Sequence, residues 1–384
     1  MLNNTELQQQ FISVFGTAAS ETFFSPGRIN LIGEHIDYNG GYVLPAAISL
    51  GISALVNRRA DNIVRIYSQD FNAETLINLA VISSEMIQQG NIQWQHYIIA
   101  TLLVLKDKNI ELRGADILIA GDLPLGAGLS SSAAIECLIA YVFNSEYYSK
   151  NRTELALDAQ RAERQYIGVN CGIMDQFAVA NGKQNRALLL NCSTLESQLI
   201  SADFSGYQLI IINSNKARTL ADSKYNERRE ECDTAFALLS KFDIASDLCH
   251  VHEISLAYLE DDILYQRAKH AVMENKRVLH AVEVLKQNNM DAFGQMLTES
   301  HISLDTDYEV SCFELNMIVH YATHFEGCIG ARMTGAGFGG CCIALVETNR
   351  VQQFIAYVGK KYTEKTTLKA DFYLAEITDG VREI

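Results

Sequence analysis

The chain has 384 residues, of which 48% are hydrophobic and 20% are charged; this is the composition of a folded globular protein, and the length favours two domains. Its 31 basic and 46 acidic side chains leave a formal net charge of -15, and such an acidic surface repels phosphate backbones and anionic lipid heads. Nucleic acid and membranes are therefore not expected as partners, whereas a local pocket of backbone N–H groups can still hold a nucleotide.

Strand-like and helical patterns mix along the chain without a regular alternation. In chain order, the predicted strands are Tyr42–Val56, Ile63–Ser68, Ala115–Ala120, Ala187–Asn191, Tyr207–Asn213 and Cys341–Val346. The predicted helices are Gln93–Leu105, Ser131–Phe143, Glu154–Tyr166, Asp222–Leu239, Leu264–Leu285 and Gln352–Tyr362. This mixture predicts an α+β fold rather than a doubly wound parallel sheet. We expect a boundary between residues 195 and 205, which gives an N-terminal domain over residues 1–200 and a C-terminal domain over residues 201–384.

Several features predict a cytoplasmic protein. The nine cysteines are scattered, odd in number and without a C-x-x-C pair, which indicates reduced thiols. The polar segment Met1–Gln10 lacks the basic start of a secretory signal. The uncharged stretch Asn39–Asn57 is interrupted by Pro45 and by glycines, so we expect buried strands there rather than a membrane span.

The segment Pro26–Gly41 concentrates polar side chains between two apolar runs. Arg28, Glu34, His35 and Asp37 lie within it, and loops of this kind are where binding groups gather on a rigid scaffold. Such groups supply the many hydrogen bonds by which a polyol is discriminated. The alternative is a solvated charged loop.

A segment rich in glycine and serine, Leu123–Ala134, follows the predicted strand Ala115–Ala120 and opens a predicted helix. Gly126 and Gly128 allow a tight turn, and the unpaired N–H groups of the helix N-terminus can bind a phosphate. The serine hydroxyls can add hydrogen bonds or a magnesium ligand. The alternative is that Ser130 only caps the helix. Because no lysine follows the second glycine, the segment is not a lysine-anchored P-loop.

Three further features are weak signals when each is taken alone. The glycine loop Met333–Gly340 precedes a predicted strand, where either the close approach of a phosphate or a tight turn explains it. Asp175 lies in a predicted first helical turn, where the dipole stabilises a carboxylate but where aspartate is also a common structural choice. Glu163 lies on a predicted helix, where a solvated charge is the usual interpretation.

Together these segments resemble the galactokinase branch of the GHMP small-molecule kinase family. They occur in the family's order from about Phe24 to Val346, which is most of the chain. The similar segments are Gly27–Tyr38 (the branch's G-R-x-N-L-I-G-E-H-x-D-Y), Pro124–Ala133 (the family's P-x-G-x-G-L-S-S-S-A), Gly172–Phe177 (G-I-M-D-Q-F), Ser223–Asn226 (the sugar-contacting tyrosine region) and Met333–Gly340 (the C-terminal glycine motif).

The resemblance implies a kinase that uses ATP and Mg²⁺ to phosphorylate the anomeric hydroxyl of galactose. It implies an N-terminal domain like ribosomal protein S5 domain 2, a ferredoxin-like C-terminal domain, and an active site in the cleft between them. Asp175 would be the catalytic carboxylate, with Arg28 beside it, and Ser131 and Glu163 would hold Mg²⁺. The residues implied to contact the sugar are Glu34, His35, Asp37, Gly172 and Tyr225. Those implied to bind ATP are Ser68, Leu125, Gly126, Ala127, Gly128, Leu129, Ser130 and Ser131.

Two alternative functions remain open at this point. One is a kinase for a related sugar, such as N-acetylgalactosamine or arabinose, which the pocket volume near the sugar's C2 would separate. The other is a sensor that binds galactose and ATP without turnover, against which the presence of Arg28, Asp175 and the complete run Ser130–Ala134 argues. A monomer is the expected assembly.

Overall fold

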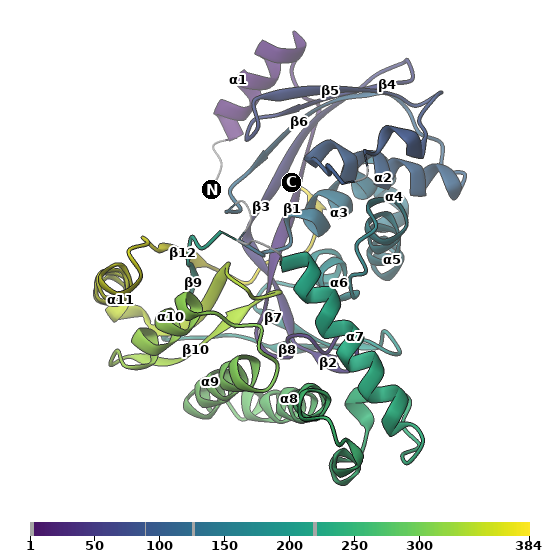
Figure 1. The fold of residues 1–384 in the computed structure, drawn as a ribbon. Helices are drawn as coiled ribbons and strands as arrows, with labels where there is room; N and C mark the ends of the chain where they lie inside the picture. Colours follow the sequence, from purple (N-terminus) through teal and green to yellow (C-terminus); the bar gives the residue numbers. More distant parts are fainter. Residues whose placement is uncertain (1–3, 89, 125–126, 218–220) are drawn as a thin grey trace.

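The structure, a computed structural model, describes residues 4–88, 90–124, 127–217 and 221–384. Figure 1 shows two units, one built on a six-stranded sheet and one on a four-stranded sheet. The helices are α1 (Asn4–Phe15), α2 (Trp94–Asp107), α3 (Ser131–Phe143), α4 (Ser145–Tyr148), α5 (Arg152–Ala162), α6 (Met174–Asn181), α7 (Ala221–Leu239), α8 (Asp262–Lys286), α9 (Met290–Thr306), α10 (Phe313–Thr323) and α11 (Val351–Thr366). The strands are β1 (Glu21–Asn30), β2 (Tyr42–Val43), β3 (Pro45–Arg58), β4 (Ile63–Ser68), β5 (Ala73–Asn78), β6 (Ala115–Gly121), β7 (Arg186–Asn191), β8 (Ser197–Ser201), β9 (Tyr207–Asn213), β10 (Cys328–Thr334), β11 (Cys341–Glu347), β12 (Asp371–Ala375) and β13 (Arg382–Glu383).

The first sheet has the strand order β13-β1-β3-β6-β4-β5. Helix α1 packs on one face of this sheet, where Phe11 contacts Leu55 and Leu118 in a small apolar cluster. Helices α3 and α6 pack against β1 and β3 on the other side. Strand β6 is therefore buried along almost its whole length, whereas β4 alternates between buried and partly exposed residues, as expected for a strand nearer the sheet edge.

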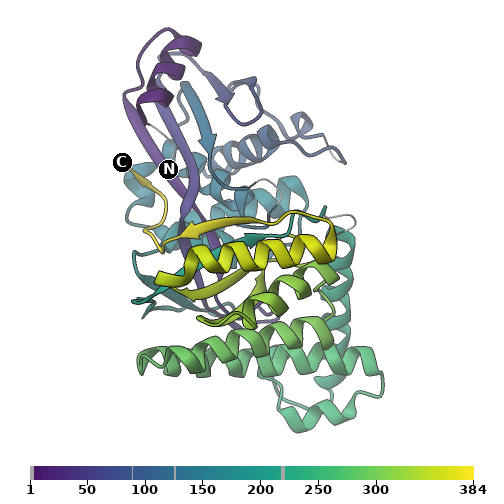
Figure 2. The ribbon, with the colours of Figure 1, turned by 90° about the vertical axis from the view of Figure 1, so that its left-hand side faces the viewer.

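The second unit is built on the sheet β10-β11-β9-β12, in which neighbouring strands are antiparallel. Helices α9, α10 and α11 pack against it. Figure 2 shows α11, in yellow, in front of this sheet, with the green helices α8 and α9 below it. A third sheet, β2-β7-β8, contacts α8. Strand β13 pairs with β1, so the last residues of the chain return to the first sheet. The division at residues 200 and 201 stays a prediction.

The structure confirms the mixed α+β architecture and reproduces the predicted bounds of β4, β9 and α3. The predicted strand Tyr42–Val56 is instead two strands, separated at Leu44. The predicted helix Glu154–Tyr166 changes at Glu163 from α5 to a π-helix, Glu163–Ile167. Strand β1 was not predicted, because its sequence contains Pro26, where the register with β3 also shifts.

The uncharged stretch Asn39–Asn57 contains β2 and most of β3, as expected for buried strands. Across the described ranges, no helix combines the length and apolar character needed to cross a membrane.

Candidate active site

A cleft of about 780 Å³ lies between helices of the N-terminal unit, helix α7 and the loop that joins β10 to β11. Its lining comes from segments that are far apart in the sequence, so only the folded chain brings these polar groups together. The predicted site residues that line it are Arg28, Glu34, His35, Asp37, Glu163, Gly172, Asp175 and Tyr225.

Arg28 and Asp175 form a bidentate ion pair in this cleft. Arg28 donates from Nε to Asp175 Oδ1 at 2.8 Å and from Nη2 to Oδ2 at 2.7 Å. The Arg28 side chain, near the end of β1, is 5% exposed, whereas that of Asp175, in the first turn of α6, is 31% exposed. The planar fork therefore fixes the carboxylate while leaving part of it open to a ligand.

The phosphate segment is tied to the same pair. Ser130 donates a hydrogen bond from its hydroxyl to Asp175 Oδ2, and Arg28 Nη1 donates to the carbonyl oxygen of Gly128 at 2.8 Å. Ser130 has a left-handed backbone with φ of 61° and makes no side-chain capping bond to α3. The interpretation of Ser130 as only a helix cap is therefore wrong, because its hydroxyl is turned to the carboxylate.

The other residues predicted to bind ATP differ in position. Leu125 and Gly126 lie outside the described residues. Ala127 is buried beside the turn, while Ser131 is the exposed first residue of α3. Ser68 ends β4, is buried, and is not among the residues that line the cleft. The structure thus ties Gly128 and Ser130 to the Arg28–Asp175 pair. Ser131 and Ser68 are not among the residues that line the cleft, and Ser68 keeps a sheet position.

Glu163 is buried at the cleft and is not the solvated helix charge that is usual for such a residue. Gln176 donates from Nε2 to Glu163 Oε2 at 2.6 Å, and to Glu136 Oε2 at 3.4 Å. Burial, and then the charge of Asp175, raises the pKa of Glu163 to about 7. Burial also raises the pKa of Glu136 well above its usual range, followed by the effect of Glu163.

Sequence reasoning missed Glu136 and Gln176. Both side chains are fully buried, and Glu136 Oε1 and Gln176 Oε1 have no hydrogen-bond partner among the described residues. A carboxylate inside the otherwise apolar helix α3 is a signal that could have identified Glu136. Glu136 lies beyond the glycine- and serine-rich segment Leu123–Ala134, so an interpretation of that segment alone does not include it.

Glu34 joins the polar segment to the C-terminal glycine loop. Its Oε1 accepts from the backbone N–H of Gly335 at 2.7 Å and from the Thr334 hydroxyl at 3.0 Å. Its Oε2 accepts from Asn30 Nδ2 at 3.0 Å. Only 1% of Glu34 is exposed, so the alternative of a solvated charged loop is wrong for this residue. A buried carboxylate is tolerated here because donors from both units satisfy it.

Asp37 and Gly172 fit together within the cleft. A Cβ atom on Gly172 would overlap Asp37 Oδ2, so glycine is required for the observed position of this carboxylate. The Tyr225 ring lies near two rings of the polar segment, with centroid separations of 5.7 Å to His35 and 5.4 Å to Tyr38. Burial raises the pKa of the Tyr225 phenol well above its usual range, so it remains a hydrogen-bond donor at neutral pH.

We expect Asp37→Asn to stabilise the ligand-free protein at pH 8 but not at pH 4. Burial, and then Asp175, raises the pKa of Asp37 from 3.8 to about 7. The folded state therefore binds this proton more tightly than the unfolded state, and stability is lost as pH rises from about 4 to 7. Asparagine removes that loss, which amounts to about 1.4 kcal/mol for each pKa unit of the shift.

Urea unfolding of the two proteins at both pH values measures this effect. The control is Asp262→Asn on the exposed start of α8, for which any difference between the two conditions should be much smaller than for Asp37→Asn. An Asp37→Asn protein with the same stability difference from the parent at pH 4 and pH 8 would contradict the buried, proton-binding environment assigned to Asp37.

Three family models match the chain in sequence order. The galactokinase galactose-binding signature matches residues 9–58, the GHMP kinases N terminal domain matches residues 96–183, and the GHMP kinases C terminal model matches residues 281–364. The two-unit fold and the cleft with its glycine loops thus define a small-molecule kinase of the GHMP type. The Methanococcus jannaschii mevalonate kinase shares this fold at a TM-score of 0.69 and 21% identity, over 94% of this chain and 99% of that one.

More similar proteins narrow the class. The galactokinase of Exiguobacterium sibiricum is 44% identical over 387 residues, which cover 100% of this chain and 99% of the relative. That of Bacillus subtilis is 45% identical over 390 residues, which cover 99% and 98%. The crystal structure of Lactococcus lactis galactokinase complexed with galactose matches at a TM-score of 0.93 and 39% identity, over 99% of each chain. The chain belongs to the galactokinase family.

Proposed function

We propose that this chain transfers the γ-phosphate of ATP to the anomeric hydroxyl of D-galactose, giving α-D-galactose 1-phosphate and ADP. The observation that carries the proposal is the bidentate Arg28–Asp175 pair, held between the phosphate segment and the polar wall of the cleft, with part of the Asp175 carboxylate open to a ligand. The galactose in the structure of the Lactococcus lactis relative supports the choice of sugar.

In the proposed reaction, Asp175 orients the sugar hydroxyl and accepts its proton. Phosphoryl transfer passes through a loose transition state, so the protein acts chiefly by positioning the reactants and neutralising charge. Arg28 keeps Asp175 in place and supplies positive charge next to the transferred group. The hydroxyl of Ser130 adds a third fixed donor to the same carboxylate.

The sugar-facing wall in this proposal consists of Glu34, His35, Asp37, Gly172 and Tyr225, all of which line the cleft. Carboxylates and a phenol suit a ligand whose recognition depends on the direction of each hydroxyl. The ATP phosphates would lie at the start of α3, held by the segment from Leu125 to Ser131, where the helix N-terminus favours negative charge. A nucleotide contact by Ser68 stays a prediction.

Mg²⁺ would be held by Ser131 and Glu163. A hydroxyl and a carboxylate are oxygen donors of the kind this ion prefers, and Glu163 lies at the cleft with Asp175 nearby. The described residues contain no group of three or more histidine, cysteine or acidic side chains suited to a metal. Two protein oxygens would suffice for an ion that the nucleotide phosphates also coordinate, because Mg²⁺ commonly takes its other ligands from phosphates and water. When bound, the ion supplies charge neutralisation to the phosphates.

We further propose a cytoplasmic location, which the nine free thiols support. A monomer stays the predicted assembly.

Release of ADP that depends on both galactose and Mg²⁺ tests the proposed function. We expect Ser131→Ala and Glu163→Gln to raise the Mg²⁺ concentration needed for half-maximal turnover, because each removes one of few protein ligands. Galactose binding, measured by calorimetry without nucleotide, should stay close to that of the parent.

The controls for this titration are Ser145→Ala, at the start of α4, and Glu154→Gln, on the exposed side of α5. Neither residue lines the cleft. If Ser131→Ala and Glu163→Gln both depend on Mg²⁺ concentration as the parent does, the metal assignment is overturned. ADP release that does not depend on galactose would overturn the proposed function.

A further inference from the structure

His35 takes part in a buried chain of hydrogen bonds that crosses between the two units. Its Nδ1 lies 2.8 Å from the Tyr38 hydroxyl, and its Nε2 lies 3.1 Å from the carbonyl oxygen of Ala336, 301 residues further along the chain. The Tyr38 hydroxyl is 2.8 Å from that of Tyr308, which in turn is 3.0 Å from Cys232 Sγ.

The chemistry of each group fixes the direction of this chain. A carbonyl oxygen only accepts, so His35 Nε2–H donates to Ala336. In a neutral ring Nδ1 is then the acceptor, and the Tyr38 hydroxyl donates to it. Tyr38 has no second hydrogen, so Tyr308 donates to Tyr38. The single hydrogen of Tyr308 is thereby used, and the Cys232 thiol donates to Tyr308.

The surroundings keep the His35 ring neutral. Burial lowers the pKa of His35 to about 3, and the nearby His270, Arg228 and Arg332 act in the same direction. Among these neighbours, the Ala336 carbonyl favours the charged form, but its effect is smaller than that of burial. A neutral ring with both nitrogens engaged has no nitrogen left for a sugar hydroxyl.

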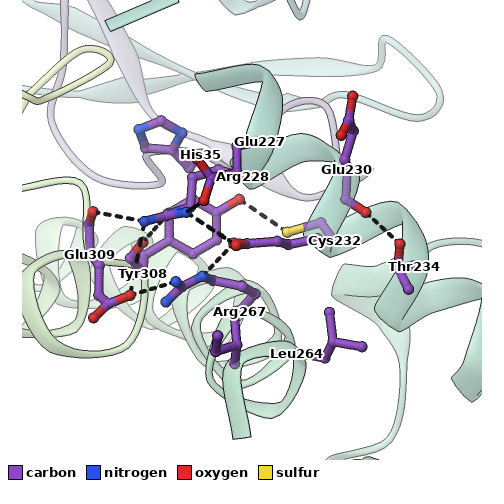
Figure 3. A network of polar contacts seen from close by, with 12 residues as sticks. His35, Glu227, Arg228, Glu230, Cys232, Thr234, Leu264, Arg267, Tyr308 and Glu309 are labelled. Atoms are coloured by element: carbon purple, nitrogen blue, oxygen red, sulfur yellow. Dashed lines mark hydrogen bonds and ion pairs between the residues drawn. The ribbon is translucent and has the colours of Figure 1, made fainter. Parts of the chain in front are cut away.

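Two buried arginines hold the segment around Tyr308, which is a member of this chain of hydrogen bonds (Figure 3). Arg228, on α7, donates from Nε to the carbonyl oxygen of Tyr308 at 2.8 Å. Arg267, on α8, donates from Nη1 to the carbonyl oxygen of Asp307 at 2.7 Å and from Nη2 to Glu309 Oε2 at 2.5 Å. Glu309 has a φ of 54°, an uncommon conformation that these contacts hold in place.

The same segment also holds the glycine loop between β10 and β11. The backbone N–H of Phe338 donates to the carbonyl oxygen of Val310 at 2.7 Å, two residues after Tyr308. The glycine loop is therefore held at two points. Its Phe338 N–H bonds to Val310, and its Ala336 carbonyl oxygen accepts from His35. Tyr225, one turn before Arg228 on α7, faces the ring of His35 at a centroid separation of 5.7 Å.

We propose that His35 is a positioning residue whose ring nitrogens bind protein rather than sugar, and that the chain from Cys232 through Tyr308 and Tyr38 sets its orientation. This proposal rests on the proposed function only for the identity of the sugar. His35 then shapes the wall of the cleft by fixing the glycine loop against the polar segment, and the sugar is hydrogen-bonded by the groups around it.

Nitrogen NMR of protein labelled with ¹⁵N-histidine tests the orientation independently of turnover. His35 is one of nine histidines, so its signals are assigned as those that disappear in His35→Gln. We expect the Nε2–H tautomer, no titration between pH 5 and pH 9, and the same tautomer after galactose is added. An Nδ1–H tautomer, a protonation midpoint near 6.5, or a change of tautomer on adding galactose would overturn the proposal.

Removal of one hydroxyl or thiol at a time tests the chain kinetically. We expect the KM for galactose to rise most in Tyr38→Phe, on the order of 10-fold, because His35 Nδ1 loses its donor. The rise should be smaller in Tyr308→Phe and smallest in Cys232→Ala, with the KM for ATP nearly constant in all three. The matched control is Tyr362→Phe, whose buried hydroxyl donates to the Ser214 carbonyl away from the cleft.

Equal KM values for galactose in Tyr38→Phe and Tyr362→Phe, or a larger effect at Cys232 than at Tyr38, would overturn the graded chain. If the protein does not turn over galactose at all, the NMR experiment still tests the proposal for His35. The lack of turnover would then contradict the proposed function and not the role of His35.

Discussion

Asp175→Asn is expected to lose roughly 10²–10⁴-fold in turnover, the range typical of a positioned acid–base group, while still binding galactose. Asparagine has nearly the same shape, and its amide oxygen can still accept a hydrogen bond from a sugar hydroxyl. It cannot accept the hydroxyl proton, nor carry the negative charge that pairs with Arg28 at 2.7 and 2.8 Å. Calorimetric galactose binding and single-turnover phosphorylation, measured on the same protein, separate the two effects.

Arg28→Lys probes the same pair from the other side. Lysine keeps the charge but cannot reproduce the planar fork that contacts both Asp175 oxygens and the Gly128 carbonyl. Its turnover should also fall, whereas Asp262→Asn, outside the cleft, should match the parent. An Asp175→Asn protein that binds galactose and turns over like the parent would show that this carboxylate is structural.

Galactose should be preferred over glucose by a factor on the order of 10⁴ in kcat/KM, because a site that hydrogen-bonds a hydroxyl is left with unpaired buried groups by an analogue that does not present it. Glucose differs from galactose in the direction of its C4 hydroxyl. The carboxylates of the cleft are already oriented by the protein, Glu34 by donors from both units and Asp37 by its fit against Gly172, and they cannot follow a moved hydroxyl without losing those contacts.

Initial rates with both sugars at saturating ATP measure this preference, and N-acetylgalactosamine and arabinose belong in the same series because related sugars are the nearest alternative. Efficiencies within a few-fold of each other for galactose and glucose would contradict a wall built to read the C4 hydroxyl.

Local patterns were sufficient to predict the elements whose sequence is regular. Strands β4 and β9 and helix α3 have clear apolar periodicity and were predicted with the bounds that the structure has. Strand β1 was missed, because Pro26 and the register shift beside it conceal the strand pattern. The side chains at the start of the polar segment therefore come from a sheet rather than from a loop, which explains why Arg28 is so firmly held.

The candidate site was predictable as a set of residues but not as a set of contacts. Motif resemblance placed Arg28, Asp175 and Glu34 together, and all three line one cleft. Contacts between distant segments could not be predicted, such as the bonds that His35 donates to Ala336 and that Glu34 accepts from Gly335, each of which spans 301 residues. The turned backbone of Ser130 was also unpredictable, since serine before a helix most often caps it.

The position of the new phosphate tests the central claim most directly. The protein is incubated with Mg-ATP and galactose labelled with ¹³C at C1, and the product is examined by ¹³C and ³¹P NMR. We predict a phosphorus-coupled C1 signal of the α anomer that accumulates in step with ADP. Phosphate attached to C6, or ADP formed without any sugar phosphate, would contradict the assignment of this cleft as a site for phosphorylating the anomeric hydroxyl of galactose.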